Sequence, residues 1–518
     1  MPELIWKGKE QVVNHHLEVP VRALEHRYDF NCPEGTESGN KIIHGDNLAA
    51  LKALLPQYEG KVKCIYIDPP YNTGNESWVY NDNVKDPRIL KWLGEVVGKE
   101  GEDLCRHDKW LCMMYPRLQL LKRLLAEDGV FLCSIDENEY HHLKLVLHEI
   151  FGRSGYAGSI CWKTRNTDNR VKSNLSIDHE YILVYSKGAP IQGRLIDRSN
   201  FGNPDNDPRG PYVTDPLTGK ATAVERPNLH YELNNPETGE CFHPDPSRGW
   251  ITDRAGIERL LSERKIWWPP DPKTGKPRKK RFLFETSARM PVSTFWADTR
   301  GQTGADELDQ IMGERVFSFP KAVELVTRVL DIACDKDAVI LDSFAGSGTT
   351  AQAVLKLNHQ DGGNRKFILI EMMDYAETIT AERVKRVING YGEESRAVTG
   401  TDGDFSFYSL GERVFDDEGN LNEALGVEKI REYVAWSERL PGAESVVNPY
   451  WLGEKDQTGY YFYYEPTRAT VLNLDFLATL TRKTGDYLIY ADICLLDEDF
   501  MRRHQIRFKK IPRDISRF

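Results

Sequence analysis

The feature that most constrains the fold is an alternation of strands and helices that a long irregular segment interrupts. In residues 41–190, apolar runs such as 62–67 and 130–136 alternate with amphipathic stretches such as 108–127. The same alternation returns in residues 319–400. Strands separated by helices of ten or more residues indicate a parallel sheet with helices on both faces. The sequence therefore predicts one α/β domain that is encoded in two pieces.

The other segments differ from this pattern in composition. Residues 191–318 are rich in Pro, Gly, Asp and Asn, and they are too long for a plain loop, so we expect an inserted domain with many turns. Residues 1–40 form an N-terminal extension. Residues 401–518 are a mixed C-terminal domain, and its last part, 485–511, predicts a small β-α-β unit.

Composition limits the classes of protein that this chain can belong to. The chain has 518 residues, of which 40% are hydrophobic, which is enough for several domains with cores of their own. We expect no membrane segment, because no run approaches the ~20 apolar residues of a membrane span, and no signal peptide. Nine scattered cysteines without a Cys-x-x-Cys pair fit a reducing cytosol better than a disulfide framework and offer no zinc site. The net charge of −11 argues against a protein that coats nucleic acid, but it allows a local basic cleft.

A glycine-containing turn, Leu341–Thr350, follows a strand and opens a helix. Gly346 and Gly348 let the backbone approach a ligand, and the helix offers free N–H groups and the positive end of its dipole. A phosphate loop needs Lys where Thr349 stands, and a nicotinamide site usually needs a third Gly where Ala351 stands. A purely structural turn is a further alternative for this segment taken alone.

A site for S-adenosylmethionine takes an acid at the strand end, a Phe-x-Gly-x-Gly turn and a second acid after the next strand. Asp342, Phe344 and Glu371 fill these places, and Glu371 would bind ribose hydroxyls. Asp46 is a third candidate acid, for the adenine ring of the cofactor, although an acid at this place can equally be a helix N-cap. The cofactor-binding residues expected from these segments are Asp46, Asp342, Phe344, Ala345, Gly346, Ser347, Gly348, Thr349 and Glu371.

A second motif, Asp68-Pro69-Pro70-Tyr71, follows the apolar run 62–67. At the carboxyl end of a parallel strand it faces the crevice where α/β proteins bind ligands. An exocyclic amine of a base is a poor nucleophile because its lone pair is delocalised into the ring. The Asp68 carboxylate and the Pro69 carbonyl can accept both N–H groups, which localises the lone pair. Pro70 helps to fix the backbone.

The fourth residue of the motif completes a base site. Tyr71 offers a face on which a base extruded from the duplex can stack. Taken alone, the motif could be a turn with an acidic helix cap, but Asn72-Thr73-Gly74 and the distant glycine turn favour catalysis. We therefore expect Asp68, Pro69, Pro70 and Tyr71 to be the catalytic residues.

At these residues the chain resembles the amino-methyltransferases of DNA. The motif Asp68–Tyr71, called the base motif below, precedes the insert 191–318, and the glycine turn follows the insert. This order resembles the β class. More specifically, five segments resemble the modification subunits of type III restriction–modification systems. These segments are 45–47, 66–75, 79–82, 110–118 and 319–321. The resemblance implies a circularly permuted Rossmann-like methyltransferase fold with 191–318 as the target-recognition domain and a small α+β C-terminal region.

The resemblance also implies partners and further site residues. Asn47 joins the cofactor site, Pro320 and Lys321 close over the methionine part of the cofactor, and Phe344 packs on it. Double-stranded DNA is the substrate. A homodimer and a helicase-nuclease restriction subunit are the expected partners, in the cytoplasm of a prokaryote and on its nucleoid. No metal is required.

The first residue of the base motif bears on the choice of base. Asp68 favours adenine N6, since enzymes for cytosine N4 usually carry Ser at this place. Cytosine N4 methylation stays open as an alternative. So do a mainly recognition or scaffold role in a defence complex, and methylation of RNA or protein glutamine, which the long insert disfavours.

Two groups of polar residues are candidates for DNA contacts. The first is a basic run that could follow the phosphates, although it could also be a solvated loop. It contains Lys273, Lys276, Arg278, Lys279, Lys280 and Arg281. The second follows the strand 160–162 and contains Arg165, Asn166 and Arg170.

Overall fold

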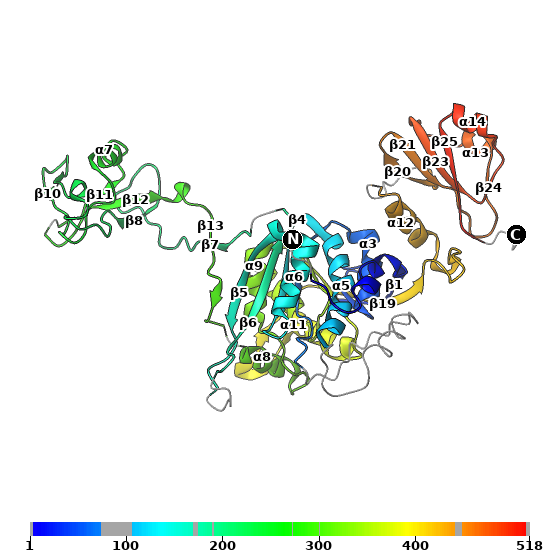
Figure 1. Ribbon diagram of the computed structural model, residues 1–518, viewed down its shortest axis with the longest axis horizontal. Coiled ribbons are helices and arrows are strands. Elements are labelled where there is room, and N and C mark those ends of the chain that lie inside the picture. Colours follow the sequence, from blue (N-terminus) through cyan, green and yellow to red (C-terminus); the bar gives the residue numbers. More distant parts are fainter. Residues whose placement is uncertain are drawn as a thin grey trace. The chain divides into compact units, whose positions relative to one another are not determined.

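The chain divides into two compact units, which Figure 1 shows in a computed structural model. Unit 1 combines Met1–Ile191 with Ser293–Phe518, and unit 2 is Gln192–Val292. The structure describes residues 4–73, 106–168, 175–188, 191–271, 273–299, 301–440 and 448–513. Within these ranges, no helix is long and apolar enough to cross a bilayer.

Unit 1 is built around a ten-stranded sheet. Its strands, in spatial order, are β1 (Arg22–Phe30), β19 (Phe405–Arg413), β2 (Lys41–His44), β16 (Lys366–Glu371), β15 (Val339–Asp342), β3 (Val62–Ile67), β4 (Leu125–Ile135), β6 (His179–Ser186), β5 (Tyr156–Lys163) and β14 (Phe295–Trp296). The six strands from β19 to β4 are parallel. The predicted parallel sheet is therefore confirmed for the centre of the domain.

Helices cover both faces of this sheet, since its central strands are buried at nearly every position. One layer contains α3 (Asn47–Tyr58), α5 (Arg106–Leu124) and α6 (Tyr140–Phe151), which pack on Ile65, Leu341 and Ile368. A second group contains α8 (Gln302–Met312), α9 (Val323–Ala333), α10 (Thr349–Asp361) and α11 (Glu382–Asn389), and a π-helical turn, Ala376–Ala381, precedes α11. Successive strand residues point to opposite faces, so Cys64 and Ile340 face away from the first layer.

Two strands at the edge of the sheet differ from the all-parallel expectation. β6 pairs antiparallel with both β4 and β5, and the described residues between β5 and β6 contain no crossover helix. A strand that returns without a crossover must run antiparallel to its predecessor. The start of β6 therefore lies at the edge where the parallel strands end.

Three predicted domain boundaries also differ from the structure. β1, from the expected N-terminal extension, pairs with β19, from the expected C-terminal domain, and β19 pairs with β2. Both strands therefore extend the central sheet. The insert ends near Val292 rather than at 318, because β14 pairs with β5 and α8 contacts α11 in unit 1.

The rest of the C-terminal part forms a separate four-stranded sheet. It contains β20 (Trp451–Lys455), β21 (Thr458–Phe462), β23 (Asp486–Ala491) and β25 (Ile506–Lys510), with α12 (Val427–Ser437), α13 (Leu474–Ala478) and α14 (Glu498–Arg503) as its helices. β23 and β25 are parallel and α14 connects them, which confirms the predicted β-α-β unit.

Unit 2 has a small core of its own. Its three-stranded sheet contains β11 (Ile266–Trp267), β12 (Arg278–Phe282) and β8 (Tyr212–Pro216). Short strands and one helix complete it: β7 (Arg194–Leu195), β13 (Arg289–Met290), β9 (Leu233–Asn234), β10 (Cys241–Phe242) and α7 (Arg254–Ser262). Trp250 and Ile257 are among its buried core residues.

The predicted basic phosphate strip is divided by the pleat of β12. Lys280 is 6% exposed, and its ammonium pairs with Asp207 at 2.9 Å and with Asp205. Its neighbours on the strand, Lys279 and Arg281, point to the other face. Lys280 is therefore a structural residue of unit 2, and its assignment to DNA contact is wrong, because two carboxylates already hold its charge inside the unit.

We predict that Lys280→Ala destabilises unit 2 by about 1.5–3 kcal/mol, because it leaves the buried Asp207 carboxylate without its ammonium partner. Hydrogen exchange of the β8 and β12 amides in the full chain measures this loss. The matched variant Lys279→Ala is expected to change protection by less than about 0.5 kcal/mol. Equal protection in both variants would contradict the structural role of Lys280.

Candidate functional site

Four segments that are far apart in the sequence meet at one edge of the central sheet. Adjacent parallel strands β2, β16, β15 and β3 end there, and their registers pair Leu341 with Ile65 and Ile370 with Ile43. The connections leave β15 and β3 in opposite directions, toward β16 and β4 respectively. A crevice at such a switch point is where open α/β sheets bind ligands. The glycine turn and the Asp68–Tyr71 motif are therefore neighbours.

The glycine turn is held by a buried acid at the end of β15. The Asp342 carboxylate accepts hydrogen bonds from the Phe344 N–H at 3.0 Å and from the Thr350 hydroxyl at 2.5 Å. Gly346 and Gly348 have φ values of 52° and 85°. A Cβ on Gly348 would lie 3.1 Å from the Thr380 carbonyl oxygen. The turn therefore needs glycine at both positions.

The second predicted acid, Glu371, is 1% exposed and supports the same turn. Its two oxygens accept the Gly346 N–H at 2.8 Å and the Met373 N–H at 3.0 Å. Burial raises the pKa of Glu371, and burial raises the pKa of Asp342 to about 7. Both acids thus shape the turn directly.

The Asp46 carboxylate caps α3 by accepting the Ala49 N–H at 2.9 Å. Its other oxygen lies 3.3 Å from the Arg117 guanidinium of α5, which also donates to the Asn47 side chain. The Asn47 amide in turn donates to the Ser343 carbonyl at 3.2 Å. Asp46 therefore has the N-cap role that the sequence left open, and it stays 39% exposed for a ligand.

The base motif forms a compact polar cluster with two residues from elsewhere. The Tyr71 hydroxyl lies 2.9 Å from Asp68 Oδ1 and 2.9 Å from Glu180 Oε2 of β6. The Lys321 ammonium lies 2.8 Å from Glu180 Oε2 and 3.3 Å from Asp68 Oδ1. Burial raises the pKa of Asp68, and the pKa of Lys321 is raised by the neighbouring Asp68 and Glu180 against the opposing effect of burial.

The position of the Lys321 side chain differs from the expected one at the methionine part of the cofactor. Its side chain joins the base motif, while its carbonyl accepts a hydrogen bond from the Thr349 hydroxyl of the glycine turn at 3.3 Å. It therefore links the two halves of the site, because its backbone and side chain face different halves. Pro320, next to it, is buried.

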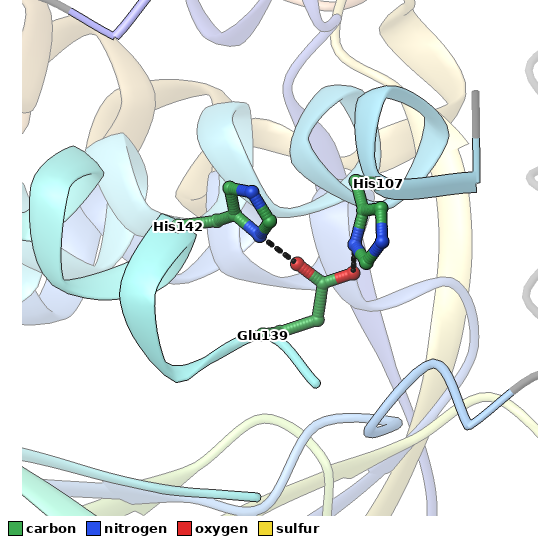
Figure 2. Close-up of side chains that lie close together, drawn as sticks. All are labelled: His107, Glu139 and His142. Atoms are coloured by element: carbon green, nitrogen blue, oxygen red, sulfur yellow. Dashed lines mark hydrogen bonds and ion pairs between the residues drawn. The ribbon is translucent and has the colours of Figure 1, made fainter. Parts of the chain in front are cut away.

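A buried carboxylate anchors the turn that carries the base motif. Glu139 is 0% exposed, and it accepts a hydrogen bond from the Asn72 amide. Figure 2 shows Glu139 between two imidazole rings, with His107 Nδ1 at 2.7 Å and His142 Nδ1 at 3.0 Å. The hydrogen bond with Glu139 raises the pKa of His142. Trp110 adds a second anchor by donating to the Pro70 carbonyl at 2.7 Å.

The ligand atoms of this triad, His107, Glu139 and His142, lie within 4.8 Å of one another, which is close enough to hold a metal ion. Each Nδ1 already lies at hydrogen-bond distance from the carboxylate, and the Asn72 amide bonds the same group. These contacts account for the triad as the support of Asn72, which directly follows the Asp68–Tyr71 motif.

Only some of the residues expected to contact DNA are exposed. Lys273, Lys276 and Arg281 are exposed, whereas Lys279 is half-buried. Arg278 donates to the Thr214 carbonyl at 2.7 Å, and Arg281 pairs with Asp215 at 2.9 Å. In unit 1, Arg165 and Asn166 are exposed, and Arg170 lies outside the described residues.

Sequence reasoning missed three residues of the site: Glu180, Arg117 and Glu139. Glu180 directly precedes the apolar run 181–185, but only the antiparallel direction of β6 brings it to the site edge. Arg117 lies within α5, and Glu139 directly precedes α6. Their side chains are only 1% and 0% exposed, and the local sequence does not indicate this burial.

Comparison with known proteins agrees with this geometry. The family model described as DNA methylase matches residues 62–382, and the chain belongs to this family. The match spans both halves of the site and the whole of unit 2.

Among individual relatives, the chain is similar to the Mod subunit of the type III restriction-modification enzyme StyLTI from Salmonella typhimurium. The two are 31% identical over 480 residues, which cover 86% of this chain and 71% of the relative. The type II methyltransferase M.KpnI from Klebsiella pneumoniae is 33% identical over 369 residues, covering 66% and 84%. The EcoP15I Mod subunit from Escherichia coli is 32% identical over 422 residues, covering 71% and 64%.

We predict that Asp342→Asn changes how stability depends on pH. The pKa of Asp342 is raised to about 7 in the folded protein, so folding favours its protonated form. The resulting contribution to the free energy of unfolding is complete below about pH 4 and is lost as the pH rises to about 7. Asp342→Asn does not lose stability in this way, because an amide does not titrate in this pH range. Its free energy of unfolding relative to the parent protein, measured by chemical denaturation, should therefore increase from pH 5 to about pH 7, at up to about 1.4 kcal/mol per pH unit.

The exposed Asp337→Asn variant is the control for removing one acid from the same segment. A difference between Asp342→Asn and the parent protein that stays constant from pH 5 to pH 8 would contradict a raised pKa for Asp342.

Proposed function

We propose that this chain transfers a methyl group from S-adenosylmethionine to N6 of an adenine that is extruded from duplex DNA. The observation that carries the proposal is the adjacency of the glycine turn after β15 and the Asp68–Tyr71 motif after β3. One offers a backbone cradle for a nucleoside cofactor, and the other offers a carboxylate and an aromatic face for a base amine. Membership of the DNA methylase family supports both halves of the proposal.

The residues fit an adenosyl cofactor. A side chain on Gly348 would crowd the Thr380 carbonyl and strain the backbone, so the tight turn needs glycine there. The Glu371 carboxylate lies at the end of β16, where it can accept ribose hydroxyls, and Asp46 lies at the end of the next strand. When bound, the cofactor supplies a methyl group on a positively charged sulfur.

The reaction needs a base amine that is oriented and more nucleophilic. The Asp68 carboxylate accepts an N–H of the amine, and the Pro69 carbonyl accepts the other, so that the nitrogen lone pair points to the methyl group. Tyr71 stacks on the base. Asp68 in the first position favours adenine over cytosine, and the names of the type III Mod relatives fit a modification enzyme.

We predict that Asp68→Ala abolishes methylation, with a loss of at least about 100-fold, since it removes the acceptor that positions the amine. Tyr71→Ala is expected to lose roughly 5- to 150-fold, which corresponds to roughly 1–3 kcal/mol of stacking. The substrate is genomic DNA without methylated adenine, and mass spectrometry of the digested nucleosides measures N6-methyladenine and N4-methylcytosine. Single-molecule sequencing of the product gives the motif.

Asp337→Ala, at an exposed acid outside the site, is the matched control and should keep parental activity. Formation of N4-methylcytosine would overturn the choice of adenine, and the absence of either product would overturn the proposal of a DNA methyltransferase.

We also propose that unit 2 recognises the target sequence, since it interrupts the catalytic fold and carries exposed cations at Lys273 and Lys276. The double variant Lys273→Ala/Lys276→Ala should reduce the slope of log affinity against log salt by about 1–2, because each phosphate contact releases about one counterion. Lys336→Ala, at an exposed lysine of unit 1, is the control. An unchanged slope in the double variant would exclude these contacts.

The similarity to Mod subunits further leads us to propose that the chain works as a homodimer with a separate restriction subunit of the helicase-nuclease type. Light scattering of the purified chain and co-purification with a co-expressed restriction subunit test the two parts separately.

A further inference from the structure

Glu180 is a carboxylate at the base motif to which the reaction described above assigns no step. Glu180 lies near the start of β6 and pairs with Trp162 of β5. Its side chain is 24% exposed, similar to the 25% of Asp68, so both carboxylates are partly accessible to solvent.

The two carboxylates converge on a single point. Asp68 Oδ1 and Glu180 Oε2 both lie 2.9 Å from the Tyr71 hydroxyl, so one small polar group touches both. An exocyclic amine has two N–H groups that diverge from one nitrogen. Asp68 accepts one of them, and Glu180 can share the other with the Pro69 carbonyl.

A cationic nitrogen also contacts both carboxylates, beside the Tyr71 hydroxyl. The Lys321 ammonium lies 3.3 Å from Asp68 Oδ1 and 2.8 Å from Glu180 Oε2. It also lies 4.7 Å from the centre of the Tyr71 ring and 5.5 Å from that of Trp162. An amine of a base stacked on Tyr71 and bonded to Asp68 would take the place of this nitrogen, and the side chain of Lys321 is long enough to withdraw.

We propose that Glu180 is a second catalytic carboxylate, which binds the target amine together with Asp68 and accepts its proton after methyl transfer. The inference rests on the proposed adenine N6 methylation. Lys321 holds the two carboxylates in place for the amine until the base enters and displaces its ammonium.

The amine nitrogen uses its lone pair to form a bond with the methyl carbon, and the carbon–sulfur bond breaks with its electron pair going to sulfur. The nitrogen then carries the methyl group, two protons and a positive charge. One of these protons passes to the Glu180 carboxylate, which leaves a neutral methylated amine.

Two negative carboxylates stabilise the positive charge while it develops on the nitrogen. When the product leaves, the Lys321 ammonium returns to Glu180, its nearer carboxylate partner. The proton then passes to water, and the site is reset.

The test compares Glu180→Gln with the parent protein in single-turnover methylation of a duplex that contains the motif found by sequencing. Gln keeps the size of the side chain but cannot take up the proton. The rate is expected to fall at least about 100-fold, within the range for loss of a general base. Affinities for S-adenosylmethionine and for the duplex, and the fluorescence of 2-aminopurine at the target position, should stay within about threefold, since binding and extrusion do not need the proton acceptor.

Two variants complete the design. Glu180→Asp keeps the charge and should recover most of the rate that Glu180→Gln loses. Glu137→Gln removes a 49% exposed acid near the same strand ends and should react at the parental rate. A Glu180→Gln rate within about threefold of the parent would overturn the inference, as would a parallel loss of cofactor binding or of base extrusion. The proposed function fails separately, if the parent protein itself forms no N6-methyladenine.

Discussion

The parallel pairing of β3 with β15 is the contact on which the site depends. It sets Leu341 beside Ile65, so that the turns after the two strands leave the same edge about 4.8 Å apart. Because the chain turns away from this pair in opposite directions, neither connection closes the space between the two turns. Everything that brings a methyl donor and a base together follows from this one register.

The same edge concentrates negative charge. Asp46, Asp68, Glu180, Asp342 and Glu371 lie there. Arg117 pairs with Asp46, and Lys321 pairs with Asp68 and Glu180. Backbone N–H groups, which the glycine turn directs at Asp342 and Glu371, offset part of the cost of burying carboxylates. Such an edge favours positive charge, and the proposed reaction brings a sulfonium donor and an amine that becomes cationic.

The central elements could be read from the sequence because both faces of their strands are buried. The predicted strand 62–67 is β3 to the residue, and the predicted segments 130–136 and 108–127 overlap β4 and α5. The edge strands could not be read in this way. β1 has no fully buried residue and β14 has two residues, so neither gives a clear apolar pattern. Their assignment to the central sheet depends on pairing with distant strands.

The sequence by itself determined the chemistry of the two turns, from Asp68 to Tyr71 and from Asp342 to Thr350, because their residue types and local order suffice to define a base site and a cofactor turn. The tertiary structure alone decided which other side chains join them. Glu180 reaches the site because β6 runs antiparallel to β4, and Lys280 is withdrawn from the predicted basic strip because the pleat of β12 turns it toward Asp207. Both outcomes depend on which strands pair, and strand pairing joins residues that local sequence patterns do not connect.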